Sequence, residues 1–566
     1  MPSSLRRLLL AALLFGIGPY TIHAQSNPEP ETISITINGR DPGTPFPHFW
    51  EQIFGSGRAI LSLRQSYRDD LATVRAVTNF DAVRFHGIFM DDVGLYDPNA
   101  TTQNPGQAPQ AAQPITVQKP DPLKRPLSDK EKEAAQTALR QELKGKYKNW
   151  VDESPYNFSY VDQIYDGLLA NHIRPFVELS FMPKKMASDP AALHAFWYKQ
   201  NVSPPKDYAL WDAMIMAFTK HLIDRYSIDE VSRWRFEVWN EPNIDFWVGN
   251  PKQSTYFELY DHTARALKAV STRIRVGGPS TAQAAWVPAF LQHVHTAKVP
   301  VDFVSSHVYG DDTAQNVFKT EENIPRADMV CRAVDKVHRE IAASPYPTLP
   351  LIFSEYNASY ANLPNVTDSI YMGPWMANTI RECAGKVDIM SYWSFSDVFE
   401  EQGVVRTPFY GGFGLIAADR IEKPAFNAFA MLHRLGDKRL PVSSDSALAT
   451  RRDDGTVVLA LWNYAPPVGD SAAYTKGEPQ GAVKHFDVNV SHLGAAANAT
   501  IYRLDESHGN AVAAFDRMGR PDFPSRDQIA QLRAAGKMAV AESVALQNGR
   551  LTIDIPPQGL VVVELH

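Results

Sequence analysis

The stretch WRFEVWNEPN, residues 234–243, indicates the fold of this chain more directly than any other. Phe236 and Val238 alternate with Glu237, which is typical of a buried β-strand. Pro242 then removes a backbone donor and ends the strand pairing, so Glu241 is expected at the last strand residue. Further along, LIFSEYN at residues 351–357 repeats the pattern and delivers Glu355. Two buried strands are therefore predicted to end near a carboxylate.

Glu241 and Glu355 have the character that glycoside hydrolysis requires. Beside Trp239, Glu241 loses water on one side, which raises the pKa of its carboxyl and suits it to donate a proton. Glu355 in a more polar setting stays ionised. This is the pairing of acid and nucleophile in a retaining glycosidase. Taken singly, either motif is as consistent with an unrelated acid at a strand end.

Strand-like and helix-like segments alternate around these two stretches. The predicted strands are His48–Phe54, Ala82–Gly87, Arg174–Ser180, Trp234–Glu241, Arg275–Pro279, Val301–Tyr309, Pro350–Tyr356 and Ile389–Phe395. Helical spacing separates them, for example at Leu63–Thr78, Tyr160–Asn171, Tyr208–Tyr226, Thr255–Val270, Ala327–Ile341 and Ile370–Ala384. This order predicts an α/β fold, a (β/α)8 TIM barrel, with its chemistry at the C-terminal ends of the strands.

Beyond Gly436 the pattern changes to short alternating strands separated by turn residues. They are predicted at Thr456–Trp462, His485–Val490, Ala499–Leu504, Leu551–Ile555 and Gly559–Leu565. Thr32–Ile37 has the same alternation. We therefore expect a catalytic barrel over 45–436 and an accessory β-sandwich domain built from 31–44 and 437–566.

The N-terminus has the pattern of a secretory signal. Arg6 and Arg7 precede the apolar run Leu8–Ile17, and the small residue Ala24 comes before a polar residue. We expect a signal peptide at 1–24 and an exported mature protein, periplasmic or extracellular, with an uncleaved anchor as the alternative. No other apolar run is long enough to cross a bilayer, so no membrane partner is expected after cleavage.

Composition narrows the class of ligand. The chain has 566 residues, of which 44% are hydrophobic and 11% aromatic, and its net charge is −7. Without a sustained basic run, nucleic acid is not an expected partner. Aromatic residues without basic stripes favour a sugar as the ligand.

Cys331 and Cys383 are the only cysteines. They fall in predicted consecutive helices, so one disulfide is geometrically conceivable. Because disulfide geometry is strict, we expect two buried thiols instead. A metal site built on cysteines is excluded by their number.

Residues 98–149 fit neither domain and are predicted to be an insertion after the second barrel strand. Pro98–Pro126 is rich in Pro, Gln, Ala and Asn, and Ser128 with Glu131 has the spacing of a capping box that would open a surface helix. A solvated loop is the expectation, because long inserts cost little closure entropy. A lid over the substrate pocket is the alternative, since the insertion leaves the catalytic side of the barrel.

Several ordered motifs carry a family resemblance. They are FGSGRA at 54–59, VRFHG at 83–87 with Asp91 and Asp92, ELSFMP at 178–183, FEVWNEP at 236–242, YWSFSDVFEE at 392–401 and GGFGL at 411–415. Together they resemble glycoside hydrolase family 39, which holds β-xylosidases and α-L-iduronidases. The resemblance runs from about residue 45 to the C-terminus, interrupted by the insertion.

The resemblance implies a role for each matched residue. Glu241 would be the general acid/base, Glu355 the nucleophile, and Asn240 the partner of the sugar 2-hydroxyl. Where relatives usually carry Thr-Glu-Trp-Asn, this chain has Ser354-Glu355-Tyr356-Asn357, which keeps an aromatic wall. The other positions matching the lining of the sugar pocket are His86, Phe181, His307, Tyr309, Trp393 and Glu401. Structural histidines and core aromatics are the alternative for these residues. Glu237 is deeper in the barrel and is predicted to be structural and ion-paired.

The expected function is an exported, retaining exo-glycosidase, a β-xylosidase, acting on an oligosaccharide or small xyloside without a metal or organic cofactor. Tyr309 is neutral where the iduronidase branch, as the resemblance implies, places a basic residue. Arg406 could still reach the pocket from a loop. An α-L-iduronidase, an arabinosidase or a non-catalytic sugar-binding protein are the alternatives.

Overall fold

The computed structural model describes residues 31–98, 128, 130, 134, 155–492 and 498–566. The predicted signal peptide (1–24) lies outside the described residues. Nearly all of the predicted insertion (98–149) also lies outside the described residues, so both the solvated loop and the lid stay predictions.

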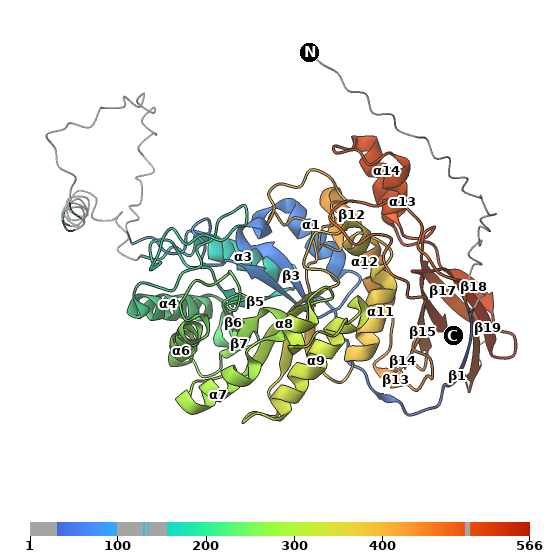
Figure 1. Ribbon diagram of the computed structural model, residues 1–566, viewed down its shortest axis with the longest axis horizontal. Coiled ribbons are helices and arrows are strands. Elements are labelled where there is room, and N and C mark those ends of the chain that lie inside the picture. The colour runs from blue at the N-terminus through green and yellow to red at the C-terminus, as the bar shows by residue number, and fades with distance from the viewer. Residues whose placement is uncertain (1–30, 99–127, 129, 131–133, 135–154, 493–497) are drawn as a thin grey trace, which may run out of the picture.

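A closed barrel of parallel strands, in the order β10-β3-β4-β5-β6-β7-β8-β9, confirms the predicted (β/α)8 fold. Helices surround the barrel, and the C-terminal strands lie to one side of it (Figure 1). Its strands are β3 (Ile53–Arg58), β4 (Ala82–His86), β5 (Arg174–Leu179), β6 (Arg235–Val238), β7 (Arg275–Thr281), β8 (Phe303–Tyr309), β9 (Leu351–Asn357) and β10 (Ile389–Tyr392). Around it lie α1 (Gln65–Arg75), α3 (Ser159–Ala170), α4 (Tyr208–Tyr226), α5 (Ile228–Val231), α6 (Lys252–Val270), α7 (Val287–Ala297), α8 (Ala314–Phe318), α9 (Arg326–Ala342), α10 (Pro364–Thr367), α11 (Met372–Cys383) and α12 (Pro424–Leu432).

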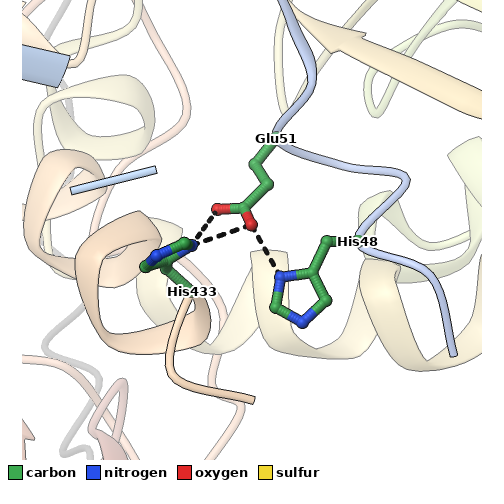
Figure 2. A group of neighbouring side chains, drawn as sticks. All are labelled: His48, Glu51 and His433. Atoms are coloured by element: carbon green, nitrogen blue, oxygen red, sulfur yellow. Dashed lines mark hydrogen bonds and ion pairs between the residues drawn. The ribbon is translucent and has the colours of Figure 1, made fainter. Parts of the chain in front are cut away.

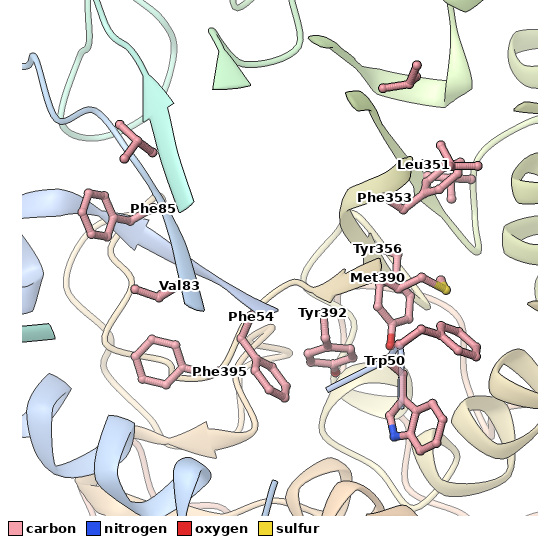
Figure 3. Close-up of a cluster of buried hydrophobic side chains, with 14 of the residues drawn as sticks. Trp50, Phe54, Val83, Phe85, Leu351, Phe353, Tyr356, Met390, Tyr392 and Phe395 are labelled. Carbon is pink, nitrogen blue, oxygen red and sulfur yellow. The ribbon is translucent and has the colours of Figure 1, made fainter. Parts of the chain in front are cut away.

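The barrel interior is layered. At the N-terminal ends of the strands an apolar layer closes the barrel: Ile53, Ala82, Phe176, Phe303, Ile352 and Ile389. Two residues further along, the inward positions are polar, with Arg84 and Glu178 after Ala82 and Phe176. Outward positions such as Phe54, Phe85 and Phe353 pack against the surrounding helices (Figure 3). Alternation along each strand thus separates a helix-facing core from a polar interior.

The first barrel strand lies further along the chain than the prediction of His48–Phe54. Phe49 and Trp50 are buried but precede the strand, which begins at Ile53. Its later part contains Gly55, where an added Cβ would lie 2.1 Å from Trp393 Cε3. Only glycine leaves room for the Trp393 ring at this position. The strand therefore lacks the continuous apolar run that is typical of a buried strand, which is why the prediction placed it too early in the chain.

The accessory domain consists of a seven-stranded sheet, β18-β17-β20-β15-β14-β13-β2, and a three-stranded sheet, β1-β16-β19. The strands are β1 (Glu31–Asn38), β2 (Thr44–Pro45), β13 (Lys438–Leu440), β14 (Ala447–Arg451), β15 (Val457–Trp462), β16 (Lys484–Ser491), β17 (Asn498–Leu504), β18 (Glu542–Ala545), β19 (Arg550–Ile555) and β20 (Leu560–Leu565). In β15 alternate residues face two cores, Leu459 the sandwich and Ala460 the α11/α12 side, which explains its continuous apolar sequence. The N-terminal β1 pairs in parallel with β16.

Two helices within the C-terminal region were not predicted. These are α13 (Ala511–Arg517) and α14 (Arg526–Gly536), which pack with the hairpin of β11 (Ile416–Ala417) and β12 (Ile421–Glu422). Among the described residues, no helix combines the length and apolar character needed to span a bilayer.

The expectation of two buried thiols is wrong. Cys331 on α9 and Cys383 at the end of α11 form a disulfide, with their Cα atoms 5.0 Å apart. The two helices are neighbours around the barrel, so their packing supplies the proximity that the sequence could not show.

Candidate active site

The prediction that Glu241 is the last residue of a strand is wrong, because the residue lies beyond the end of strand β6. Strand β6 ends at Val238, and the backbone then turns through positive φ at Trp239 (71°) and Glu241 (43°). Ser280 on β7 secures the turn, because its carbonyl accepts from Glu241 N at 2.9 Å and its hydroxyl donates to Trp239 O at 3.1 Å. The neighbouring strand therefore aims the Glu241 side chain into the mouth of the barrel.

Glu355 is placed by an irregularity of β9. The pairing of β8 with β9 passes from Ser306↔Phe353 to His307↔Glu355, so Ser354 is an extra residue on β9. This bulge lets two consecutive side chains face the interior, since Ser354 contacts His307 and Glu355 contacts Tyr309. A regular strand would have sent one of them outward.

Most of the predicted site residues line one pocket at the C-terminal end of the barrel. They are His86, Asn240, Glu241, Tyr309, Glu355, Trp393 and Glu401. Phe181 and His307 lie behind the wall. Phe181 is fully buried and stacks on Phe246 with a ring separation of 6.0 Å, whereas His307 contacts Glu241 from inside the barrel.

Arg84 connects the carboxylates of the barrel interior and was not among the predicted site residues. Its guanidinium, fully buried, donates to Glu237 Oε2 at 2.6 Å, Glu355 Oε1 at 2.6 Å and Asn240 Oδ1 at 2.9 Å, and it pairs with Glu178 at 2.8 Å. The prediction that Glu237 is ion-paired is thereby confirmed. The sequence feature that could have indicated Arg84 is a charged residue within the apolar strand AVRFH. A guanidinium buried in such a strand requires carboxylate partners.

A chain of hydrogen bonds leads from Glu237 to Glu241. Ser354 Oγ donates to Glu237 Oε1 at 2.5 Å, so it accepts from His307 Nε2 at 3.1 Å. Burial and the Arg84 charge hold the pKa of His307 well below its usual value, so the ring is neutral and its Nδ1 is an acceptor. Glu241 Oε1 lies 3.0 Å from Nδ1. In this arrangement the hydrogen between Glu241 Oε1 and His307 Nδ1 belongs to Glu241, which is the donor.

The electrostatics of the pocket agree with that assignment. Burial, followed by the negative charges of Glu355 and Asp312, raises the pKa of Glu241 well above its usual range. Glu355 instead receives the Arg84 guanidinium and the Tyr309 hydroxyl, both at 2.6 Å. One oxygen of each carboxylate lies within 4.8 Å of the other. The site thus holds, at short range, one carboxyl group whose pKa is raised and one that is paired with a guanidinium and a tyrosine hydroxyl.

Aromatic rings form the apolar wall of the pocket. Trp393 lies above Arg84, with 5.9 Å from the guanidinium carbon to the ring centroid, and packs edge-on against Phe399. Tyr309, Trp393, Phe399 and Phe413 make one buried cluster. Such a flat apolar wall suits the face of a sugar ring.

Residues from loops and from the short 3-10 helix Ala282–Ala284 complete the pocket and were not predicted. They are His194, Phe196, Ile244, Asp245, Phe246, Ala282, Gln283, Asp312, Tyr360 and Phe413. Asp312 is buried, which raises the pKa of its carboxyl to about 7, and its Oδ2 accepts from Tyr309 N at 2.8 Å. Arg406 does not line this pocket; it lies in a neighbouring one beside Asp522, at 3.5 Å. Residues outside the strands carry no strand periodicity, so no sequence pattern selects them as site residues.

Two groups of side chains among the described residues have the composition and spacing to hold a metal ion. One is Glu241 with His307 and Glu355, within the pocket already described, and the other is His48 with Glu51 and His433. In the first group, the hydrogen bonds given above account for both oxygens of Glu355, both ring nitrogens of His307 and one oxygen of Glu241.

Comparison with known proteins identifies the family. The sequence model of glycosyl hydrolases family 39 matches residues 33–106 and 131–552. A β-xylosidase of Geobacillus stearothermophilus is 35% identical over 95% of this chain and 95% of its own length. A human α-L-iduronidase is 23% identical over 70% of this chain and 64% of its own.

A solved structure also supports membership of this family. The crystal structure of a monomeric β-xylosidase from Caulobacter crescentus CB15 superposes with a TM-score of 0.77 at 31% identity, covering 94% of this chain and 99% of that one. The chain belongs to glycoside hydrolase family 39, and it is a glycoside hydrolase.

Proposed function

We propose that the chain is an exported, retaining β-xylosidase that removes terminal β-D-xylosyl residues from xylo-oligosaccharides or xylosides. One observation carries the proposal: a carboxyl whose pKa is raised and a carboxylate held by Arg84 and Tyr309 share one pocket, with oxygens within 4.8 Å. Retaining glycosidases place their two carboxyl groups about 5–5.5 Å apart, and inverting ones about 6.5–9.5 Å.

In the first step Glu241 donates its proton to the leaving oxygen while Glu355 attacks the anomeric carbon. The bond from carbon to the leaving oxygen breaks and an ester to Glu355 forms. Loss of the Glu355 charge lowers the pKa of Glu241, since that charge helps to raise it. Glu241 then acts as the base that takes a proton from water, and water attack releases the sugar with its configuration retained.

The choice of xylose rests on the charges around the pocket. Among the described residues that line it, none is Lys or Arg, while Asp245, Asp312 and Glu401 are acidic. A uronate would bring its own carboxylate into this space, and an unpaired buried charge costs several kcal/mol. Two curated β-xylosidases, at 35% and 30% identity, match 95% and 94% of this chain, whereas the canine α-L-iduronidase, at 23% identity, matches 71%.

Export is supported by the signal-like N-terminal sequence and by the disulfide. Cys331 and Cys383 are paired, and such bonds persist in oxidising compartments such as the periplasm or the extracellular space. Fractionation of the native host with an antibody against the protein tests this: a cytoplasmic, uncleaved product would contradict it.

The catalytic assignment is tested with Glu355→Gln and Glu241→Ala. We expect Glu355→Gln to abolish turnover, because the ester cannot form. We expect Glu241→Ala to slow only aryl xylosides with poor leaving groups and to be rescued by azide. Nuclear magnetic resonance of the first product should show retained anomeric configuration, and an inverted product would refute the mechanism.

Specificity is tested separately with matched aryl glycosides. The β-xyloside should have a much higher kcat/KM than the α-L-iduronide and the arabinoside, and Tyr309→Lys alone should not reverse that order. A higher kcat/KM for the iduronide would overturn the proposed substrate while leaving the family assignment intact.

A further inference from the structure

A second group of convergent side chains lies at the opposite end of the barrel from the catalytic pocket. His48 and Glu51 come from the segment before β3, and His433 directly follows α12. Figure 2 shows both imidazole rings turned toward the Glu51 carboxylate, which lies between them. The proposed catalytic reaction uses none of these residues.

The distances within this group are short. His48 Nδ1 lies 2.6 Å from Glu51 Oε1, and His433 Nδ1 lies 2.9 Å from Oε1 and 3.0 Å from Oε2 (Figure 2). The Glu51 side chain is fully buried and that of His48 is 9% exposed, whereas that of His433 is 36% exposed. The group is thus open to solvent on the His433 side only.

The surroundings fix the His48 ring in one orientation. Its Nε2 lies 3.1 Å from the carbonyl oxygen of Leu435, which can only accept, so Nε2 carries a hydrogen. The ring stacks on Trp50 with 4.4 Å between centroids. The other ring nitrogen, Nδ1, is thereby directed at the Glu51 carboxylate, 2.6 Å from Oε1. The same oxygen also accepts from Asn79 Nδ2 at 3.0 Å and lies 2.9 Å from His433 Nδ1, so it is surrounded by three nitrogen atoms.

We propose that His48, Glu51 and His433 bind a divalent transition-metal ion, with Zn²⁺ as the best match, and that the ion ties the start of the barrel to its last helix. Two imidazole nitrogens and one carboxylate are a known Zn²⁺ ligand set, with a fourth position open to water. A metal-binding histidine usually donates a hydrogen bond from its second ring nitrogen to a carbonyl or carboxylate, as His48 does to the carbonyl of Leu435.

The space around the group is compatible with an ion. The three ligand atoms lie within 4.8 Å of one another. Zn²⁺ with bonds of about 2.0–2.1 Å separates tetrahedral ligands by roughly 3.4 Å. His48 Nδ1, now 2.6 Å from Glu51 Oε1, therefore has to move away by about 0.8 Å, and His433 Nδ1, now 2.9 Å away, by about 0.5 Å. The adjacent pocket also contains Arg434 and Arg452, which both pair with Glu564, at 3.1 and 2.5 Å, so that one of their two positive charges is compensated.

The test measures Zn²⁺ binding to the full chain, purified without a histidine tag and stripped with a chelator that is then removed. Calorimetric titration with ZnCl₂ should give about one ion per chain, whereas MgCl₂ should give none, because Mg²⁺ prefers oxygen ligands. Titrations are repeated in Glu355→Gln, so that any ion at the catalytic carboxylates is recognised by its loss in that variant.

His433→Gln is the diagnostic variant. Glutamine keeps a polar side chain at this partly exposed position, and we expect at least a tenfold weaker Zn²⁺ binding with unchanged turnover in metal-free buffer. The control is His485→Gln, which removes a histidine from another His–carboxylate pair, with Asp554 on the sandwich, and should bind as the unchanged chain does. Zn²⁺ should raise the unfolding temperature of the unchanged chain and of the control only.

Two results would overturn the proposal. If the folded, stripped chain binds no Zn²⁺, the group is a hydrogen-bonded cluster without a metal ion and the proposal fails. If binding survives His433→Gln at full affinity, the ion lies elsewhere. Absorption spectroscopy with Co²⁺ in place of Zn²⁺ provides a second readout, since nitrogen and oxygen ligands in a tetrahedral arrangement give visible bands that His433→Gln should abolish.

Discussion

Replacing Ser354 with alanine is expected to shift the pH dependence of catalysis without removing either carboxylate. In the unchanged protein, Ser354 Oγ accepts from His307 Nε2, and His307 Nδ1 then accepts the proton of Glu241. Without the hydroxyl, the ring loses the acceptor that fixes this tautomer. The other tautomer donates from Nδ1 to the Glu241 carboxylate, stabilises its charge and lowers its pKa.

The size of the shift follows from one hydrogen bond. A hydrogen bond to a charged group contributes about 1.5–3 kcal/mol, and one pKa unit corresponds to about 1.36 kcal/mol. The pKa of Glu241 should therefore fall by about 1–2 units. Glu241 is active as an acid only below its pKa, so kcat/KM is lost as pH rises through that value. The alkaline limb of the profile should move to lower pH by the same amount.

The assay compares kcat/KM across pH for phenyl and dinitrophenyl β-xyloside. The phenyl substrate needs proton donation, so its alkaline limb reports Glu241. The dinitrophenyl substrate does not, so its rate reports whether the neighbouring Glu355 has moved. Ser391→Ala is the matched control, a buried barrel serine whose Oγ has no hydrogen-bond partner among the described residues, and Ser354→Thr should keep the original profile. An alkaline limb that stays in place or moves upward in Ser354→Ala would refute the tautomer assignment.

Arg84→Met should destabilise the fold by about 3–5 kcal/mol, because it leaves several buried carboxylates without their cation; denaturant unfolding measures this, and a loss below 1 kcal/mol would contradict the role of Arg84. Tyr309→Phe removes the hydroxyl that donates to Glu355 at 2.6 Å and should lower kcat/KM for an aryl β-xyloside about 10–100-fold with the unfolding temperature nearly unchanged. Equal activity of the two proteins would show that the contact is dispensable. Joint replacement of Cys331 and Cys383 by serine should cost about 4 kcal/mol, the chain-entropy estimate for a separation of 52 residues. If the variant unfolds at the same denaturant concentration as the oxidised protein, that account is wrong.

The sequence by itself determined the barrel, because each strand and helix has its own local pattern. The alternation around Phe236 and Val238 and the apolar start of β9 reflect burial that every residue of the segment shares. The continuous apolar run of β15 is likewise a local consequence of burial on both faces. These patterns also brought Glu241 and Glu355 to the same end of the barrel, since parallel strands end on one side.

Only the tertiary structure decided how those carboxylates differ. The turn after β6 is set by Ser280 on the next strand, and the bulge at Ser354 by the register of β8 with β9. The cation that pairs with Glu355 is Arg84, which lies 271 positions away along the chain. The disulfide depends in the same way on two helices packing side by side. A residue's own sequence neighbourhood contains no information on which distant group will face it. Closure of the barrel fixes those pairings, and with them the pKa of Glu241 and the proton it carries.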